Sequence, residues 1–225
     1  MLNNKKLIGS ILGVIAILLV ALMAVSQVDE SPKPMGLPAQ QGNIEVSPYQ
    51  MVNLQEFIPG IVVDLRYAGD KNVYGEKIYE DDTARLRLGT VQKLKAAQKE
   101  FREMGYRLKI WDAYRAPDAQ FKLWEIMPDT RYVVNPNTGF SYHSRGVAVD
   151  VTLVDQAGNE VPMPSGFDDF TDLANRDFSD IDEIGAANAR LLEKVMVKHG
   201  FLSIYYEWWH FADSERDQYD VVEHP

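Results

Sequence analysis

The chain has 225 residues, of which 46% are hydrophobic, and a formal net charge of −10. This length favours one domain with a sizeable hydrophobic core. The acidic balance repels phosphate backbones, so nucleic acid is excluded as an expected partner. The chain has no cysteine, which excludes disulfides, thiolate catalysis and cysteine-based zinc sites. Any metal ion must therefore be held by His, Asp or Glu.

The N-terminus carries the pattern of a targeting segment. Lys5 and Lys6 precede 19 residues without a charge, Leu7 to Val25. This pattern predicts either a cleaved signal peptide, with Ala24 and Ser26 at the cleavage site, or an uncleaved signal anchor that spans the membrane. No cysteine follows the apolar stretch, so lipoprotein attachment is excluded. Both interpretations place the body of the protein outside the cytoplasm, in the periplasm or cell envelope.

We therefore divide the chain into a signal peptide or signal anchor (1–27), a linker (28–48) and a catalytic domain (49–225). The linker is polar, contains prolines and has no periodicity. Without Lys5 and Lys6, the 23 basic residues fall to 21 against 33 acidic ones, a net charge of −12 for the rest of the chain.

Hydrophobic periodicity predicts strands and helices in mixed order along the domain. The expected strands are 61–63, 106–115, 146–155 and 201–213, and the expected helices are 90–105, 116–127 and 186–200. Thr90 and Gly105 are the expected caps of the first helix. The acidic segment 167–183 lacks a helical period and is expected to be a loop. The fold class is therefore α+β, with a small central antiparallel sheet flanked by helices.

Asp150 lies inside the valine-rich run of the strand 146–155. Alternation places Val149 and Val151 on one face and Asp150 on the other, toward a polar site. A buried carboxylate requires a partner. His143 lies seven residues earlier, across a short turn that can bring the imidazole beside the carboxylate. The pair supplies two of the three protein ligands that a catalytic zinc ion needs.

The third ligand is expected to be one of the remaining histidines. His224 lies next to the chain end, and His199 lies at a helix C-terminus, where the helix dipole explains it. His210 lies in "EWWHF", three residues after Glu207. A regular strand would place Glu207 and His210 on opposite faces, so a twist or bulge is expected if both enter the site. A carboxylate beside a metal-bound water is suited to act as general base.

These residues resemble a known family. "SYHSRGVAVDVTL" and "EWWHF" are similar to the two zinc motifs of the D-alanyl-D-alanine dipeptidases known from vancomycin resistance, which are relatives of the zinc D,D-carboxypeptidases. The family pattern, Ser-x-His-x₆-Asp and then Glu-x-x-His, is matched by Ser141, His143, Asp150, Glu207 and His210. The resemblance extends from about Val62 to the end of the chain.

The resemblance implies one Zn²⁺ per chain on the sheet, with His143, Asp150 and His210 as ligands. It implies that Glu207 takes a proton from the attacking water and passes it to the leaving amine. "WDAYRAP" resembles the segment that carries the essential arginine of the family, so Arg115 would stabilise the oxyanion.

Three further residues are implied to contact the substrate. "VPMPSGFDDF" resembles the segment whose aspartate meets the substrate ammonium, which matches Asp168, and "DLRYA" resembles the segment that contributes a tyrosine, which matches Tyr67. Ser141 is implied to contact the substrate carboxylate; capping a turn is the alternative. Asp112, three residues before Arg115, is expected to orient the arginine.

The leading interpretation is thus a zinc dipeptidase that hydrolyses D-alanyl-D-alanine, a small dipeptide, to two D-alanines. The alternative is a zinc D,D-carboxypeptidase that trims peptidoglycan stem peptides, for which an open cleft without an ammonium anchor would be expected. A third interpretation, a peptidoglycan-binding module without activity, would require a missing ligand or base. All the expected residues are present.

Overall fold

The computed structural model describes residues 47–223. The predicted signal segment 1–27, almost all of the linker 28–48, and His224 lie outside these residues, so the domain boundaries and the membrane anchor at residues 7–25 stay predictions. Within the described range, no helix combines the length and the apolar character needed to cross a membrane.

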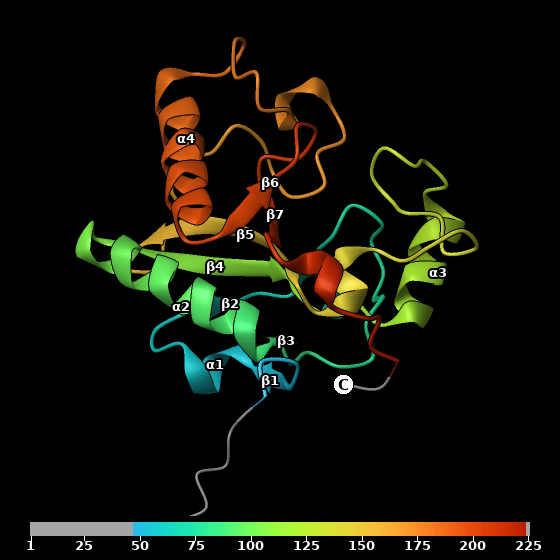
Figure 1. The fold of residues 1–225 in the computed structure, drawn as a ribbon. Coiled ribbons are helices and arrows are strands. Elements are labelled where there is room, and N and C mark those ends of the chain that lie inside the picture. The colour runs from blue at the N-terminus through green and yellow to red at the C-terminus, as the bar shows by residue number, and fades with distance from the viewer. Residues whose placement is uncertain (1–46, 224–225) are drawn as a thin grey trace, which may run out of the picture. The chain divides into compact units, whose positions relative to one another are not determined.

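A five-stranded sheet forms the centre of the domain (Figure 1). Only the edge pair β2–β4 is parallel, and the other neighbours are antiparallel. The strands, in spatial order, are β2 (Val62–Val63), β4 (Tyr106–Asp112), β5 (Ala148–Asp155), β7 (His210–Asp213) and β6 (Phe201–Ser203). The predicted α+β class with a central sheet is confirmed, and the sheet is antiparallel as predicted except for the pair β2–β4.

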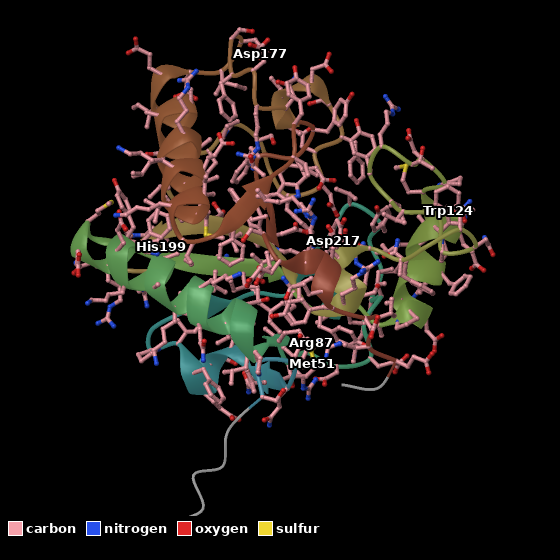
Figure 2. The ribbon with its side chains drawn as sticks, in the orientation of Figure 1. Met51, Arg87, Trp124, Asp177, His199 and Asp217 are labelled. Carbon is pink, nitrogen blue, oxygen red and sulfur yellow. The ribbon has the colours of Figure 1, made fainter. Side chains whose placement is uncertain are left out.

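Two further strands form a small separate sheet that the sequence did not predict. β1 (Met51–Asn53) pairs antiparallel with β3 (Arg85–Arg87). Met51 lies opposite Arg87 in this register, and both are labelled in Figure 2. Strands of three residues are too short to show an alternating pattern.

The two long helices α2 (Leu88–Glu103) and α4 (Glu183–Lys198) contact each other, and they contact β4 and β6 respectively. Their apolar residues share one hydrophobic core with the sheet. The shorter helix α3 (Pro117–Ile126) lies beyond the carboxyl end of β4, apart from α2 and α4 (Figure 1). α1 (Leu54–Phe57) is a single turn.

The expected cap at Thr90 is wrong. α2 begins at Leu88, and the buried Thr90 hydroxyl instead donates to Asp213 Oδ2 at 2.8 Å. Thr90 therefore ties the first turn of α2 to β7. At the other end the expectation holds, because Gly105 follows the helix with φ +88, a left-handed conformation that glycine adopts without strain.

The single strand expected at 201–213 is also wrong. The segment is a hairpin, with β6 and β7 joined by residues 204–209. Glu207 lies in the connection, and the His210 N–H donates to the Glu207 carbonyl at 3.3 Å. This tight turn, rather than a twist or bulge in a continuous strand, carries the chain from Glu207 to His210.

Short 3₁₀ helices complete the domain: η1 (Arg66–Ala68), η2 (Tyr142–Arg145), η3 (Asp172–Ala174) and η4 (Arg216–Gln218). Apart from η3 and the first residue of α4, the acidic segment 167–183 has no helix or strand, as expected. A register shift between Ile110 and Asp112 marks an irregularity at the end of β4. This is where the polar side chains of the site begin.

Candidate metal centre and catalytic site

Three neighbouring strands bring the polar residues of the site together. In the sheet register, Asp112 of β4 lies opposite Asp150 of β5, and Asp150 lies opposite His210 of β7. All three residues are buried. The site therefore lies where β4 ends, β5 begins and β7 begins, and the order of strands in the sheet fixes its position.

His143, Asp150 and His210 form a group that can hold a metal ion. His143 Nε2 is 3.2 Å from His210 Nδ1 and 3.4 Å from Asp150 Oδ1, and His210 Nδ1 is 2.9 Å from Asp150 Oδ1. Ligands at zinc–nitrogen and zinc–oxygen bond lengths around a tetrahedral ion would be about 3.3 Å apart. The spacing of the three ligand atoms thus fits one tetrahedral ion.

The protonation states also fit a metal site. The Ala113 carbonyl lies 2.7 Å from His143 Nδ1, so Nδ1–H donates to this carbonyl and Nε2 keeps its lone pair for the metal. Burial raises the pKa of Asp150, but the His143 and His210 imidazoles outweigh it and hold this pKa below its usual value. Two imidazoles and one carboxylate, without thiolates, suit a catalytic zinc ion with an open position.

The local sequence explains how His143 reaches its place. Ser141 caps η2, since its Oγ accepts from the His143 N–H at 3.2 Å. Gly146 ends η2 with φ +71, and a Cβ on this residue would lie 2.7 Å from Met51 Sδ. The sequence Ser-x-His-x-x-Gly thus makes a compact turn that returns the imidazole to the beginning of β5.

Glu207 lies beside the ligand group. Its carboxylate is buried, and Oε2 is 3.8 Å from His210 Nδ1. Burial raises the pKa of Glu207 well above its usual value, and the nearby charges of Asp150 and Asp168 act in the same direction. A carboxylate with a raised pKa accepts a proton at neutral pH more readily than an exposed one does.

The Arg115 guanidinium is buried and held by three neighbours. It donates from one terminal nitrogen to Asp112 Oδ2 at 2.6 Å, from the other to Gln120 Oε1 at 3.2 Å, and from Nε to the Tyr79 hydroxyl at 3.4 Å. The expected contact between Asp112 and Arg115 is present. Gln120 was missed, although a glutamine on the inner face of α3 is a recognisable signal; nothing in the sequence pattern points to Tyr79.

Asp168 and Tyr67 form a second buried pair. The Tyr67 hydroxyl donates to Asp168 Oδ2 at 2.6 Å, and Asp168 is 6% exposed. Asp168 has φ 54, in the left-handed region, so the backbone turns sharply at this residue. Burial raises the pKa of Asp168 to about 7, despite the hydrogen bond from Tyr67. Among the described residues, no hydrogen bond reaches the second oxygen, Oδ1.

One cavity of about 370 Å³ joins these groups, a volume in the usual range of small-molecule sites. Aromatic and aliphatic residues of the segment 130–142 form another part of its wall. All eight residues expected from the sequence line it: Tyr67, Arg115, Ser141, His143, Asp150, Asp168, Glu207 and His210. Their roles in binding and catalysis stay predictions.

His199, by contrast, has no part in this cavity. It lies at the C-terminal end of α4, close to α2 (Figure 2), and its Nε2 is 2.7 Å from Glu100 Oε2. The interpretation of His199 as a helix-terminal residue agrees with this position.

A metal-ligand triad, a buried carboxylate beside it and a buried guanidinium in one cavity define a metal-dependent hydrolase. The comparisons with known proteins specify the class further. The family model described as D-ala-D-ala dipeptidase, of peptidase family M15, matches residues 48–223. The chain belongs to this family of metallopeptidases.

Several relatives are called D-alanyl-D-alanine dipeptidase. The one from Escherichia coli (strain K12) is 34% identical over 173 residues, which cover 77% of this chain and 89% of the relative. The one from Enterococcus faecalis (strain ATCC 700802 / V583) is 32% identical over 179 residues, or 70% and 88% of the two chains. Among solved structures, VanYB in complex with D-alanine-D-alanine matches with a TM-score of 0.40 and 15% identity, over 60% of this chain and 75% of that one.

Proposed function

We propose that this protein hydrolyses D-alanyl-D-alanine to two D-alanines, with one Zn²⁺ held by His143, Asp150 and His210. The observation that carries the proposal is the Asp168–Tyr67 pair in the cavity of the metal ligands. A buried carboxylate with one oxygen free of protein hydrogen bonds is suited to bind a cation. In a dipeptide this cation is the N-terminal ammonium.

Asp168 thereby selects the length of the substrate. Tyr67 holds one carboxylate oxygen and leaves the other for the ammonium. A longer peptide has an amide at this point, which carries no charge and continues into another residue. The burial of Asp168 within the cavity favours the dipeptide over the stem pentapeptide that a D,D-carboxypeptidase would trim.

The zinc ion, when bound, supplies a Lewis acid that polarises the scissile carbonyl and lowers the pKa of a water molecule to about 7. Glu207 accepts a proton from the attacking water on its carboxylate and delivers it to the nitrogen of the leaving D-alanine. Arg115 donates N–H groups to the oxygen of the scissile carbonyl as negative charge develops there. The guanidinium is already fixed by Asp112 and Gln120, so it needs no reorientation.

A comparison of two substrates tests the proposal. Purified protein from Gly42 onward is assayed with D-alanyl-D-alanine and with a stem pentapeptide that ends in D-alanyl-D-alanine. We expect the dipeptide to be cleaved and the pentapeptide to remain intact. Cleavage of the pentapeptide alone would instead assign the protein as a D,D-carboxypeptidase, and cleavage of neither by zinc-loaded protein would remove both assignments.

A matched pair of variants links the result to Asp168. Asp168→Asn is expected to raise KM for the dipeptide at least about tenfold, because the neutral amide no longer pairs with the ammonium. Asp169→Asn is the control, since Asp169 accepts a hydrogen bond from the Thr171 N–H on the surface. Equal KM values for the two variants would contradict the role of Asp168.

The proposed location is outside the cytoplasm. Lys5 and Lys6 followed by the charge-free stretch 7–25 support it, and either a cleaved signal peptide or a signal anchor is consistent with this pattern. An enzyme in the cell envelope would salvage the dipeptide or process peptidoglycan fragments. Fusions of alkaline phosphatase after residue 48 test the location, and N-terminal sequencing of the mature protein distinguishes cleavage from anchoring. An inactive fusion that is present in normal amount would contradict it.

A further inference from the structure

The connection between β6 and β7 carries the proposed base and leads directly into a metal ligand. Residues 204–209 lie outside both strands, although the Trp209 carbonyl accepts from the Val151 N–H of β5 at 3.0 Å. The other backbone groups of this connection need partners outside the sheet. Two hydrogen bonds join the connection to the end of η3 and the residues after it: the Trp208 N–H donates to the Ala174 carbonyl, and the Arg176 N–H donates to the Tyr205 carbonyl, both at 2.9 Å.

The Arg176 side chain makes most of the remaining contacts. Its Nε donates to the Ile204 carbonyl at 2.7 Å. One terminal nitrogen lies 3.3 Å from the Glu207 carbonyl, 2.9 Å from the Trp208 carbonyl and 3.3 Å from the His210 carbonyl. A single guanidinium thus reaches the backbone at both ends of the turn from Glu207 to His210, and also at the start of the connection.

Arg176 is packed as well as hydrogen-bonded. Its side chain is 8% exposed, and its guanidinium carbon lies 4.8 Å from the centre of the Phe211 ring in β7. The nearest carboxylate, Glu193 of α4, is 3.5 Å away. The guanidinium therefore donates mainly to backbone carbonyls, and its planar fork of N–H groups is a geometry that a lysine cannot reproduce.

We propose that Arg176 is a positioning residue, which fixes the Glu207–His210 turn so that the Glu207 carboxylate faces the metal ion held by His210. This inference rests on the proposed zinc-dependent function. The geometry of the turn supports the role of Arg176. The side chains of Glu207 and His210 are three residues apart and both line one cavity, whereas a regular strand would direct them to opposite faces. The carbonyls of Glu207 and His210 share one donor, a terminal nitrogen of Arg176, so the backbone at these two residues is held in a fixed relative position.

The test compares Arg176→Met with Arg190→Met. Arg190 is an exposed arginine of α4 whose guanidinium lies 5.3 Å from the Phe178 ring, so it is a control for loss of a cation in the same part of the fold. For Arg176→Met we expect kcat to fall at least tenfold with KM within threefold of the wild type, and zinc affinity to fall at least tenfold in competition with a chelator. The visible spectrum of the cobalt-substituted protein is expected to change.

Arg176→Ala with added guanidinium chloride at millimolar concentration separates positioning from general stability. We expect the guanidinium ion to restore part of kcat and part of the zinc affinity. The kcat and zinc affinity of Arg176→Lys are expected to lie between those of the wild type and the alanine variant. Recovery of the melting temperature without recovery of kcat or zinc affinity would make Arg176 merely structural and overturn the proposal. So would a folded Arg176→Met variant with normal zinc affinity and normal kcat.

The two proposals fail in different ways. If the wild type binds zinc but leaves D-alanyl-D-alanine intact, the substrate assignment fails. In that case the zinc affinity and the cobalt spectrum of the Arg176 variants still decide the role of Arg176, because neither depends on the substrate.

Discussion

Asp150 and His210 face each other directly across β5 and β7, and Asp150 Oδ1 lies 2.9 Å from His210 Nδ1. The sheet register thus brings two of the three metal ligands together, while His143 needs the additional turn of η2. Strand pairing preorganises this ligand pair, and the turn held by Arg176 leads directly into His210.

Removal of the metal or of one ligand is therefore expected to abolish activity. Dialysis against a chelator should give inactive protein, and one equivalent of Zn²⁺ per chain should restore it. Asp150→Ala should lose zinc and lower kcat/KM by about a thousandfold or more, since the metal contributes several kcal/mol to transition-state stabilisation. Asp155→Asn, at the other end of β5, is the control. Full zinc content in Asp150→Ala would contradict the ligand set.

Glu207→Gln should separate metal binding from proton transfer. The amide keeps the size of the side chain but cannot accept a proton, so kcat is expected to fall by about 10²–10⁴-fold. Zinc content and KM should remain close to those of the wild type. Glu215→Gln, which changes an exposed partner of Lys93, provides the comparison. A kcat within threefold of the wild type would exclude Glu207 as the base.

Arg115→Lys should lower kcat even though the positive charge is kept. The ammonium of lysine cannot satisfy Asp112 and Gln120 in the fork geometry of the guanidinium while also pointing to the substrate. The loss is expected to be about 10²–10³-fold, as for other oxyanion donors. Arg131→Lys is the matched control, because Arg131 lines the same cavity from its exposed rim. Equal kcat values for the two variants would contradict this role.

Tyr67→Phe should change the pH dependence of substrate binding. Burial raises the pKa of Asp168 to about 7, and the hydrogen bond from Tyr67 lowers it. Loss of this bond raises the pKa further, so Asp168 becomes protonated, and unable to bind an ammonium, at a higher pH. The rise of KM on the acid side should move upward by roughly half to one pH unit. Tyr142→Phe is the control, because the Tyr142 hydroxyl contacts Asp217 and not Asp168. The pH dependence of KM should not move in this variant.

Gly146→Ala should destabilise the fold and weaken the metal site together. The residue has φ +71, and its new Cβ would meet Met51 Sδ at 2.7 Å. The expected loss is about 1–3 kcal/mol in the free energy of unfolding, measured by urea denaturation of zinc-free protein. Gly139→Ala is the control, since no atom lies within 4 Å of a Cβ at that position. A similar loss in both variants would mean that crowding at Met51 has no special effect.

The elements that the sequence predicted are those with a pattern of their own. α2, α4 and β5 each carry enough apolar residues at a regular spacing to be recognised without their neighbours. β1 and β3 carry no such pattern, because each exists only through pairing with a segment far away in the chain. The sequence pattern predicts one strand where the hairpin of β6 and β7 lies, because aromatic residues continue through its connection.

The candidate site divides in the same way. The metal ligands could be predicted because their spacing in the motif reflects a compact turn and a strand. Tyr79 and Arg176 could not, since Tyr79 contacts a residue that is distant in the sequence and Arg176 contacts backbone carbonyls. Every residue type has a backbone carbonyl, so the sequence does not indicate which carbonyls accept hydrogen bonds from Arg176.

The ligand set spans much of the chain, because 67 positions separate His143 from His210. In a protein without cysteine, the metal ion would act as a covalent staple does elsewhere, by closing a loop of this length between η2 and β7. Each tenfold increase in free zinc above the dissociation constant should add about 1.4 kcal/mol to the stability of the folded chain. The cofactor of the reaction would then also protect the chain against proteolysis.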